Sequence, residues 1–222
     1  MKKGYADIVL GLQYGDEGKA RVVDYLAKDY DVIARFNGGS NAGHTIENDK
    51  GSIAVRQIPS GIFYPNKTLY IGTGCAVNIE KLAGEMTQLK KLDLDVSSRL
   101  KISSLASIIQ PHHLLLDEML GKSIGTTKNG IGPSYADRAT RMVGDRMVNI
   151  RLADLVDQPN EFFANITKNL DATIKDYTLK NLDVKKIVQD LKKAFAQIKP
   201  FIELDPLYLE KKVAKGATVL FE

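Results

Sequence analysis

Cysteine and long apolar runs are what this sequence most clearly lacks. Its 222 residues include one cysteine, Cys75, which cannot form a disulfide within the chain, so a reducing compartment is expected. No apolar run approaches the roughly 20 residues that a membrane-spanning helix needs. Met1-Lys2-Lys3-Gly4 leads into only a short apolar run that contains Asp7, which is not the pattern of a signal peptide. These absences exclude a disulfide scaffold, and they predict a cytoplasmic protein with no membrane partner.

The composition is that of an ordinary globular protein. Hydrophobic residues make up 44% and charged residues 26% of the chain, which excludes a disordered or collagen-like chain. The net charge is +4, and much of the excess comes from lysines after residue 165 that alternate with acids such as Asp171, Asp176 and Asp190. A helical face in contact with water explains this pattern better than a nucleic-acid-binding stripe does. We therefore expect no nucleic acid partner.

Short apolar runs alternate along the chain with apolar residues at helical spacing. The runs predict strands over residues 6–10, 31–36, 69–71, 100–102 and 217–221. The helical spacing predicts helices over residues 20–28, 78–92, 111–121, 184–198 and 207–215. The first strand is expected to be buried. The alternation predicts an α/β fold with a mostly parallel central sheet, flanking helices and a helical segment after about residue 150.

The first predicted strand leads to Gly15-Asp16-Glu17-Gly18-Lys19, which opens the next helix. A glycine loop between a strand and a helix can turn backbone N–H groups toward a phosphate, and the start of the helix favours an anion. The P-loop pattern fails here, because Gln13 stands where its first glycine should be and Ala20 replaces its metal-binding hydroxyl residue. Asp16 is a candidate Mg²⁺ ligand or general base. A strand-to-helix turn with two solvated acids explains the same residues.

A second loop, rich in glycine and asparagine, contains Asn41-Ala42-Gly43-His44-Thr45. Glycines let the backbone approach a ligand closely, and His44 can donate a proton near neutral pH. Because the ends of parallel strands meet at one edge of a sheet, Asp16 and His44 are expected at the same edge. A lone loop histidine is more often simply exposed, so the functional interpretation depends on this pairing with Asp16.

A third loop runs from Gly125 to Pro133 and precedes Arg138 and Arg141. Its hydroxyls and N–H groups can hold a phosphate, and two arginines three residues apart on a predicted helix would share a face that grips an anion. An ordinary loop followed by surface arginines is the alternative. A weaker metal candidate is the pair His113 and Asp117, for which surface pairing is favoured because no third ligand stands nearby.

Together these loops resemble the adenylosuccinate synthetase family, GTP-dependent enzymes of purine nucleotide synthesis. The segments that match in order and approximate spacing are Gln13 to Lys19, Asn41 to Thr45, Ile58-Pro59-Ser60-Gly61, Ile124 to Thr127 and Gly130 to Pro133. The resemblance is specific over about residues 5–150 and thinner beyond. It implies a P-loop-NTPase-like fold and a homodimer that binds IMP, GTP, L-aspartate and Mg²⁺. In the implied reaction the γ-phosphoryl of GTP goes to O6 of IMP, and aspartate then displaces phosphate to give adenylosuccinate.

The resemblance also implies roles for matched residues. Asp16 looks like the base that removes the N1 proton of IMP and binds Mg²⁺, and His44 like the acid that assists phosphoryl transfer. Lys19 would stabilise developing phosphate charge, and Gly43 would lend its carbonyl to Mg²⁺. The implied GTP-binding residues are Gly15, Asp16, Glu17, Gly18, Lys19, Ala20, Arg21, Gly43, His44 and Thr45. The implied IMP-binding residues are Asp16, Glu17, Gly18, Lys19, Asn41, Ala42, Gly43, His44, Thr127 and Arg141, of which Arg141 would reach the partner subunit's site.

Three positions and the length depart from the family. Tyr14, Ala20 and Arg21 stand where tryptophan, glycine and lysine are usual, and family members are often about twice as long. We therefore expect a single, incomplete α/β domain over 1–222, with a nucleotide- and IMP-binding core over 1–150 and a mainly helical extension over 151–222 that ends in a strand. Alone, this portion is expected to be inactive. The alternatives are a non-catalytic nucleotide-binding or dimerising module and a P-loop NTPase of another kind.

Overall fold

A parallel sheet forms the centre of the molecule in the computed structural model, which describes residues 3–13, 17–49, 51–121 and 125–222. Its six strands lie in the order β1-β12-β2-β5-β7-β11, and each neighbouring pair runs parallel. The strands are β1 (Tyr5–Ile8), β12 (Thr218–Phe221), β2 (Val32–Arg35), β5 (Thr68–Ile71), β7 (Leu100–Ser103) and β11 (Ile202–Glu203). The predicted α/β fold with a mostly parallel sheet is confirmed.

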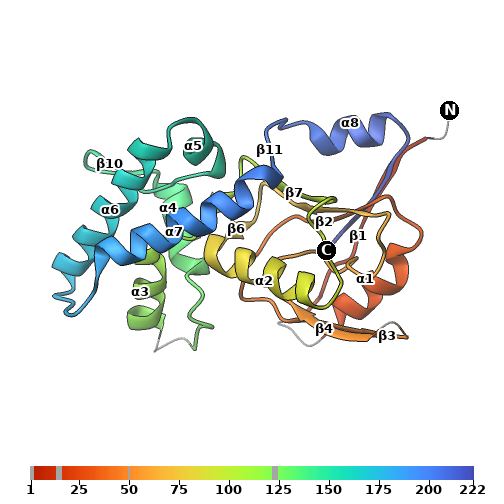
Figure 1. The fold of residues 1–222 in the computed structure, drawn as a ribbon, viewed down its shortest axis with the longest axis horizontal. Helices are drawn as coiled ribbons and strands as arrows, with labels where there is room; N and C mark the ends of the chain where they lie inside the picture. The colour runs from red at the N-terminus through yellow and green to blue at the C-terminus, as the bar shows by residue number, and fades with distance from the viewer. Residues whose placement is uncertain (1–2, 14–16, 50, 122–124) are drawn as a thin grey trace.

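Alternate residues of the central strands belong to two apolar layers, because successive side chains point to opposite faces of a sheet. Val32 of β2 packs on the face covered by α8 (Tyr208–Ala214). Ile33 packs in the larger core on the other face. The elements that contribute to this core beside the sheet include α1 (Lys19–Ala27), α2 (Ile79–Lys91) and the hairpin of β3 (His44–Asn48) and β4 (Gly51–Val55). Figure 1 shows α8 on one side of the sheet and the hairpin on the other.

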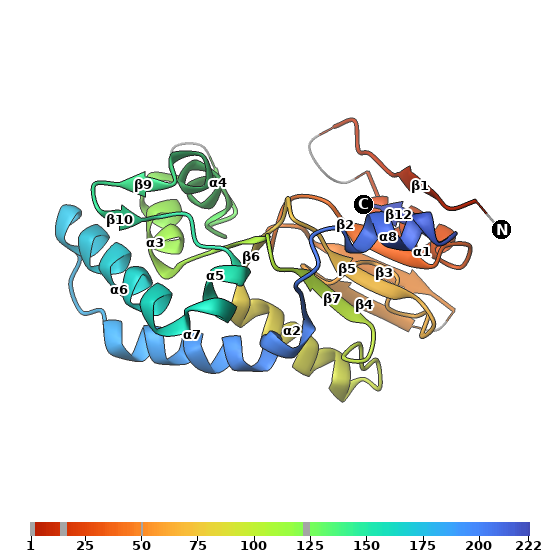
Figure 2. The same cartoon turned by 90° about the horizontal axis from the view of Figure 1, so that it is seen from above.

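A group of helices lies beside the sheet, as both views show (Figures 1 and 2), and we call it the helical lobe. Its elements are α3 (Pro111–Leu120), α4 (Ile131–Thr140), α5 (Leu152–Asp157) and α6 (Pro159–Asp176), with the short pair β9 (Met142–Val143) and β10 (Arg146–Met147). The pair β6 (Ala76–Val77) and β8 (Ser107–Ile108) connects the lobe to the sheet, and α7 (Val184–Ile198) packs along α2 and α6. Within the described residues no helix is long and apolar enough to cross a bilayer.

The segment after residue 150 contributes to both parts. It supplies α5, α6 and α7 to the helical side, and it also supplies β11 and β12 to the sheet. A short 3₁₀ turn, Lys199–Phe201, links α7 to β11. The division of the chain at about residue 150 stays a prediction.

The first strand is exposed, and our prediction of a buried strand there is wrong. All four residues of β1 are exposed, with 47% of Tyr5 and 59% of Ile8 accessible to water. The cause is the position of β1, which lies at the edge of the sheet and is paired with β12 alone among the described strands. An apolar run predicts that a strand forms, but not what covers it.

Candidate active site

The first loop ends at the start of α1, where the backbone conformation favours glycine. Gly18, the N-cap of α1, has a φ of 73°, which lies in the left-handed region that glycine enters without steric cost. Lys19 Nζ lies 2.7 Å from Oε2 of Glu17, and this hydrogen bond is the main reason that the pKa of Glu17 is lowered to about 2. Ala20 is buried in the core, so only its backbone could touch a nucleotide. Tyr14, Gly15 and Asp16 lie outside the described residues.

Our prediction that His44 lies in a loop is wrong. It is the first residue of β3, with Thr45 as the second, because the backbone here pairs antiparallel with β4 and places His44 opposite Val55. Only 11% of its side chain is exposed. Its Nδ1 lies 3.1 Å from Oγ of Ser60. The alternative of a simply exposed loop histidine is therefore wrong.

The side chain of Glu222, directly after β12, contacts both Ser60 and His44, although Glu222 is far from them in the sequence. Its Oε1 accepts the N–H of Ser60 at 3.0 Å, and its Oε2 accepts the Ser60 hydroxyl at 2.6 Å. Oε1 also lies 3.6 Å from Nδ1 of His44. Burial alone would raise the pKa of Glu222, but the hydrogen bonds and charges of His44, Arg35 and Ser60 hold it below its usual value. Local sequence patterns could not find this contact, because Glu222 is 162 positions from Ser60.

The second and third loops meet at a cavity of about 480 Å³. Asn41 and Thr127 both line it, together with residues of α3 and the first turn of α4. The amide of Asn129 connects the two loops, since its Oδ1 accepts from Ser40 Oγ at 3.3 Å and its Nδ2 donates to the Thr127 carbonyl at 3.0 Å. The structure thus brings together two of the residues implied to bind IMP. Neither His44 nor Lys19 is among the residues that line this cavity.

Asp117 holds the third loop in place. Its Oδ2 accepts the backbone N–H of Gly130 at 2.7 Å, directly before α4 begins. Both Asp117 and His113 are buried, so the pair is not the surface pair that we favoured. The alternative, in which His113 and Asp117 ligate a metal together, is also wrong, because His113 bonds to a different carboxylate, that of Asp137.

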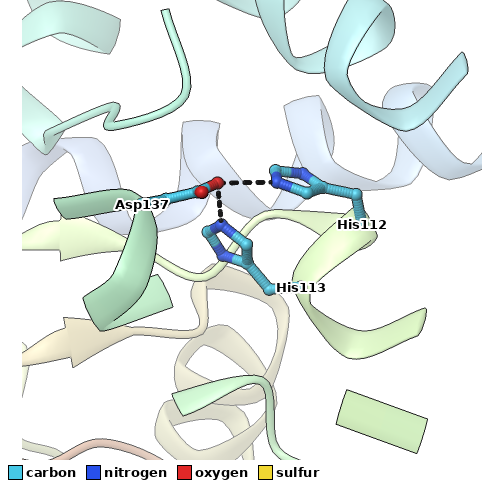
Figure 3. Close-up of side chains that lie close together, drawn as sticks. All are labelled: His112, His113 and Asp137. Carbon is cyan, nitrogen blue, oxygen red and sulfur yellow. Dashed lines mark hydrogen bonds and ion pairs between the residues drawn. The ribbon is translucent and has the colours of Figure 1, made fainter. Parts of the chain in front are cut away.

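Two buried histidines share one carboxylate oxygen in the helical lobe (Figure 3). Nε2 of His112 and Nε2 of His113, both from the first turn of α3, each lie 2.9 Å from Oδ2 of Asp137 in α4. Burial lowers the pKa of His113 to about 4, although the hydrogen bond with Asp137 opposes the shift. Burial alone would raise the pKa of Asp137, but the two histidine hydrogen bonds hold it far below its usual range.

The ligand types of this cluster suit a metal ion, but its hydrogen bonds do not. Nδ1 of His113 accepts the backbone N–H of Gln110 at 3.0 Å. A neutral His113 therefore carries its proton on Nε2 and donates it to Asp137, which leaves no lone pair there for a metal. We interpret the cluster as a structural link between α3 and α4.

Our prediction that Arg138 and Arg141 share a helix face is wrong. The helix α4 ends at Thr140, and Arg141 follows it with a φ of 65°. Arg138 Nη1 donates to the carbonyl of Thr73 at 3.1 Å. Arg141 is exposed, and its carbonyl accepts the N–H of Val148 at 3.0 Å. The two guanidinium groups therefore do not form the joint anion grip that helical spacing predicts.

The parallel sheet, with glycine-containing loops after its strands, defines a P-loop-NTPase-like α/β protein. Within that class, the sequence profile of the adenylosuccinate synthetase family matches residues 8–222, and the chain belongs to this family. The chain is 46% identical over 221 residues to adenylosuccinate synthetase 2 of Cupriavidus pinatubonensis, covering 100% of this chain and 48% of that protein. It is 40% identical over 224 residues to adenylosuccinate synthetase of Limosilactobacillus fermentum, covering 97% of this chain and 50% of that protein.

Solved structures agree with the family. The fully ligated adenylosuccinate synthetase of Plasmodium falciparum matches with a TM-score of 0.83 at 30% identity, covering 98% of this chain and 50% of that chain. A succinoaminodeoxyadenylate synthetase of cyanophage S-2L, bound to dGMP and dATP, matches with a TM-score of 0.62 at 16% identity, covering 100% of this chain and 51% of that chain, which shows a shared fold alone. The chain thus spans about half the length of the proteins that it matches.

Proposed function

We propose that this chain provides the IMP site and the catalytic acid of an adenylosuccinate synthetase. That enzyme would join IMP and L-aspartate, with GTP as the phosphoryl donor. The observation that carries the proposal is the single cavity at which Asn41 and Thr127 meet. Asn41 and Thr127 come from separate loops, and only the fold brings them to one cavity.

The phosphate of IMP is proposed to bind where α4 begins. Ile131 and Gly132, in the first turn of α4, line the cavity beside Thr127. The backbone N–H groups of a first helical turn have no partner within the helix, and together with the helix dipole they favour an anion. The Thr127 hydroxyl can donate one further hydrogen bond to the same anion.

The chemical step is proposed to use the first and second loops. Asp16 would remove the N1 proton of IMP, which makes the purine O6 a nucleophile. His44 would donate a proton as the phosphoryl group is transferred. Lys19 would exchange its bond with Glu17 for the developing phosphate charge, in the manner of other phosphoryl-transfer sites.

Magnesium and the partner subunit complete the proposal. Mg²⁺ prefers oxygen ligands, and Gly43 offers a carbonyl at a point where an added Cβ would meet no described atom within 4 Å. Asp16 and Gly43 would hold the ion, which when bound neutralises phosphate charge. Arg141 is proposed to reach the partner's site in a homodimer, and the exposed apolar residues Met142 and Val143 follow it directly.

Cellular location is also part of the proposal. We place the enzyme in the cytoplasm, where a reducing environment keeps thiols free. The only cysteine is buried, and burial raises the pKa of its thiol to about 11. A cysteine in this state stays protonated and unreactive.

Thermal unfolding with nucleotides tests the proposal. IMP at about a hundredfold excess over its dissociation constant should stabilise the folded chain by about 2.7 kcal/mol, because it binds only the folded state. GTP and NAD serve as comparison ligands. Thr127→Ala should reduce the IMP shift, while Thr167→Ala should leave it unchanged, because the Thr167 hydroxyl bonds within α6 to the Phe163 carbonyl.

Two outcomes would count against the assignment. No shift with IMP, or an equal loss of shift in both threonine variants, would mean that this cavity is not the IMP site. The non-catalytic binding module stays the alternative. Asp16→Asn in the whole enzyme that contains this chain separates the two, because loss of a catalytic base removes turnover, whereas a binding module has no turnover to lose.

A further inference from the structure

Two buried side chains from distant parts of the chain surround Nδ1 of His44. Ser60 is fully buried, and the Glu222 side chain is 1% exposed. The segment before Ser60 is itself held, because the Glu85 carboxylate accepts the N–H groups of residues 56–58 at 3.0–3.1 Å. The Glu222 backbone is anchored too, since its N–H donates to the Ala34 carbonyl at 2.9 Å. The surroundings of His44 are therefore rigid parts of the fold.

The direction of the hydrogen bonds follows from counting hydrogens. A serine hydroxyl has one hydrogen to donate. The 2.6 Å contact of Ser60 Oγ with the Glu222 carboxylate uses that hydrogen, because an ionised carboxylate can only accept. At its 3.1 Å contact with His44, Ser60 Oγ must then accept, so Nδ1 of His44 carries a proton. In the neutral ring, Nε2 is left with the lone pair.

We propose that Ser60 and Glu222 are positioning residues that fix neutral His44 as the Nδ1–H tautomer and leave Nε2 to exchange a proton with a ligand. Glu222 acts on the ring through Ser60, because it accepts the only hydroxyl hydrogen of Ser60 and leaves Oγ to accept from Nδ1. It also contacts the ring directly, with 3.6 Å between Glu222 Oε1 and Nδ1. The bearing of this arrangement on catalysis rests on the proposed function. The tautomer itself does not, because it is a property of the folded chain without substrate.

Glu222→Gln tests the proposal by reversing the direction of the hydrogen bonds. The backbone N–H of Ser60 must still find an acceptor, which the amide oxygen of glutamine provides. The amide NH₂ then faces Ser60 Oγ, whose hydrogen is forced toward Nδ1 of His44. We expect the ratio of the Nδ1–H to the Nε2–H tautomer to fall by about tenfold, the size that one hydrogen bond allows.

The tautomer is read directly from the ring ¹⁵N signals of the histidines at a pH of about 8, above the usual histidine range. The chain has three histidines, so His112 and His113 serve as internal controls that should not change. Glu203→Gln removes a carboxylate on β11 whose described contacts are Lys101 and Asp205, and it should leave His44 unchanged. His44→Gln assigns the signals.

An Nε2–H tautomer in the unmodified chain, or an unchanged tautomer in Glu222→Gln, would overturn the proposal. If Glu222→Gln does not fold, Ser60→Ala decides instead, because loss of Oγ should also weaken the Nδ1–H preference, and an unchanged preference would overturn the role of Ser60. The IMP experiment stands apart from this result. An IMP shift with no tautomer change removes only the positioning role, and a tautomer change with no IMP shift removes only the proposed function.

Discussion

At the scale of single residues, the buried ring of His113 couples the stability of the helical lobe to pH. Its pKa is lowered from 6.5 to about 4 in the folded chain. Between these values the unfolded chain binds a proton that the folded chain does not bind. The free energy of unfolding should therefore fall as the pH decreases from about 6.5 to about 4, by about 3 kcal/mol. Urea unfolding across this window measures the effect.

His113→Gln is the variant that isolates this linkage. Glutamine can still donate to Asp137 but does not titrate, so its free energy of unfolding should change less over the same window. Equal pH slopes for the two proteins would show that His113 does not cause the dependence. Asp137 acts at lower pH, since its pKa is held below 3.8, and its contribution is lost only as the pH falls below that unfolded value.

Residues could be predicted where a local pattern surrounds them. Asn41 and Thr127 stand in glycine-rich loops, and the fold places both at one cavity. Glu222 and Asp137 carry no such pattern, and pairing of distant strands and helices brings them to His44 and His113. Their carboxylates reach their partners only in the folded chain. The spacing of residue types along the sequence therefore does not predict these contacts.

At the scale of elements, two helices begin at glycines whose backbone is left-handed. Gly18 before α1 has a φ of 73°, and Gly130 before α4 has a φ of 72°. An added Cβ at Gly18 would meet no described atom within 4 Å, whereas at Gly130 it would lie 2.9 Å from Ile109 Cγ2 and 3.1 Å from His113 Cβ. Gly18→Ala should cost about 1 kcal/mol from the backbone alone. Gly130→Ala should cost about 1–3 kcal/mol more because it also overpacks the α3–α4 contact.

The two glycine variants are matched, so their difference measures packing. Chemical unfolding of both, at one pH, gives that difference as a change in midpoint at constant slope. Equal losses would mean that the structure around Gly130 relaxes and that only the backbone matters. Turn glycines of this kind could be predicted from sequence, because both stand directly before a predicted helical pattern or within a glycine loop. The packing around each of these two glycines could not be predicted from the sequence.

Other element boundaries were less predictable. The apolar period predicted α1, α2, α3, α7 and α8 and every strand of the central sheet except β11, since it reports which face of an element is buried. It did not predict the long helix α6. It did not predict that β3 begins at His44, because that strand is defined by pairing with β4 rather than by its own pattern. Nor did it predict the exposure of β1, which depends on which strand lies at the edge of the sheet.

At the scale of the whole molecule, the sheet and the helical lobe look separate in Figure 2, but one apolar core joins them. Leu69 of β5 and Phe163 of α6 belong to the same cluster of buried side chains. The helix α7 packs against α2 beside the sheet and against α6 of the lobe, with Phe195 in edge contact with Phe163 at 5.9 Å between ring centres. A continuous core of this kind favours one cooperative unit over two.

We therefore expect sheet and lobe to unfold together, as the predicted single domain requires. Leu191 of α7 is 2% exposed in this shared core, and Leu191→Ala should lower the free energy of opening by about 3 kcal/mol. Hydrogen exchange should report the same loss in peptides from β5 and from α6. Leu207→Ala, at a side chain that is 52% exposed, is the matched control and should change neither. A loss confined to α6 would mean that the helical lobe opens on its own, and the single-domain prediction would be wrong.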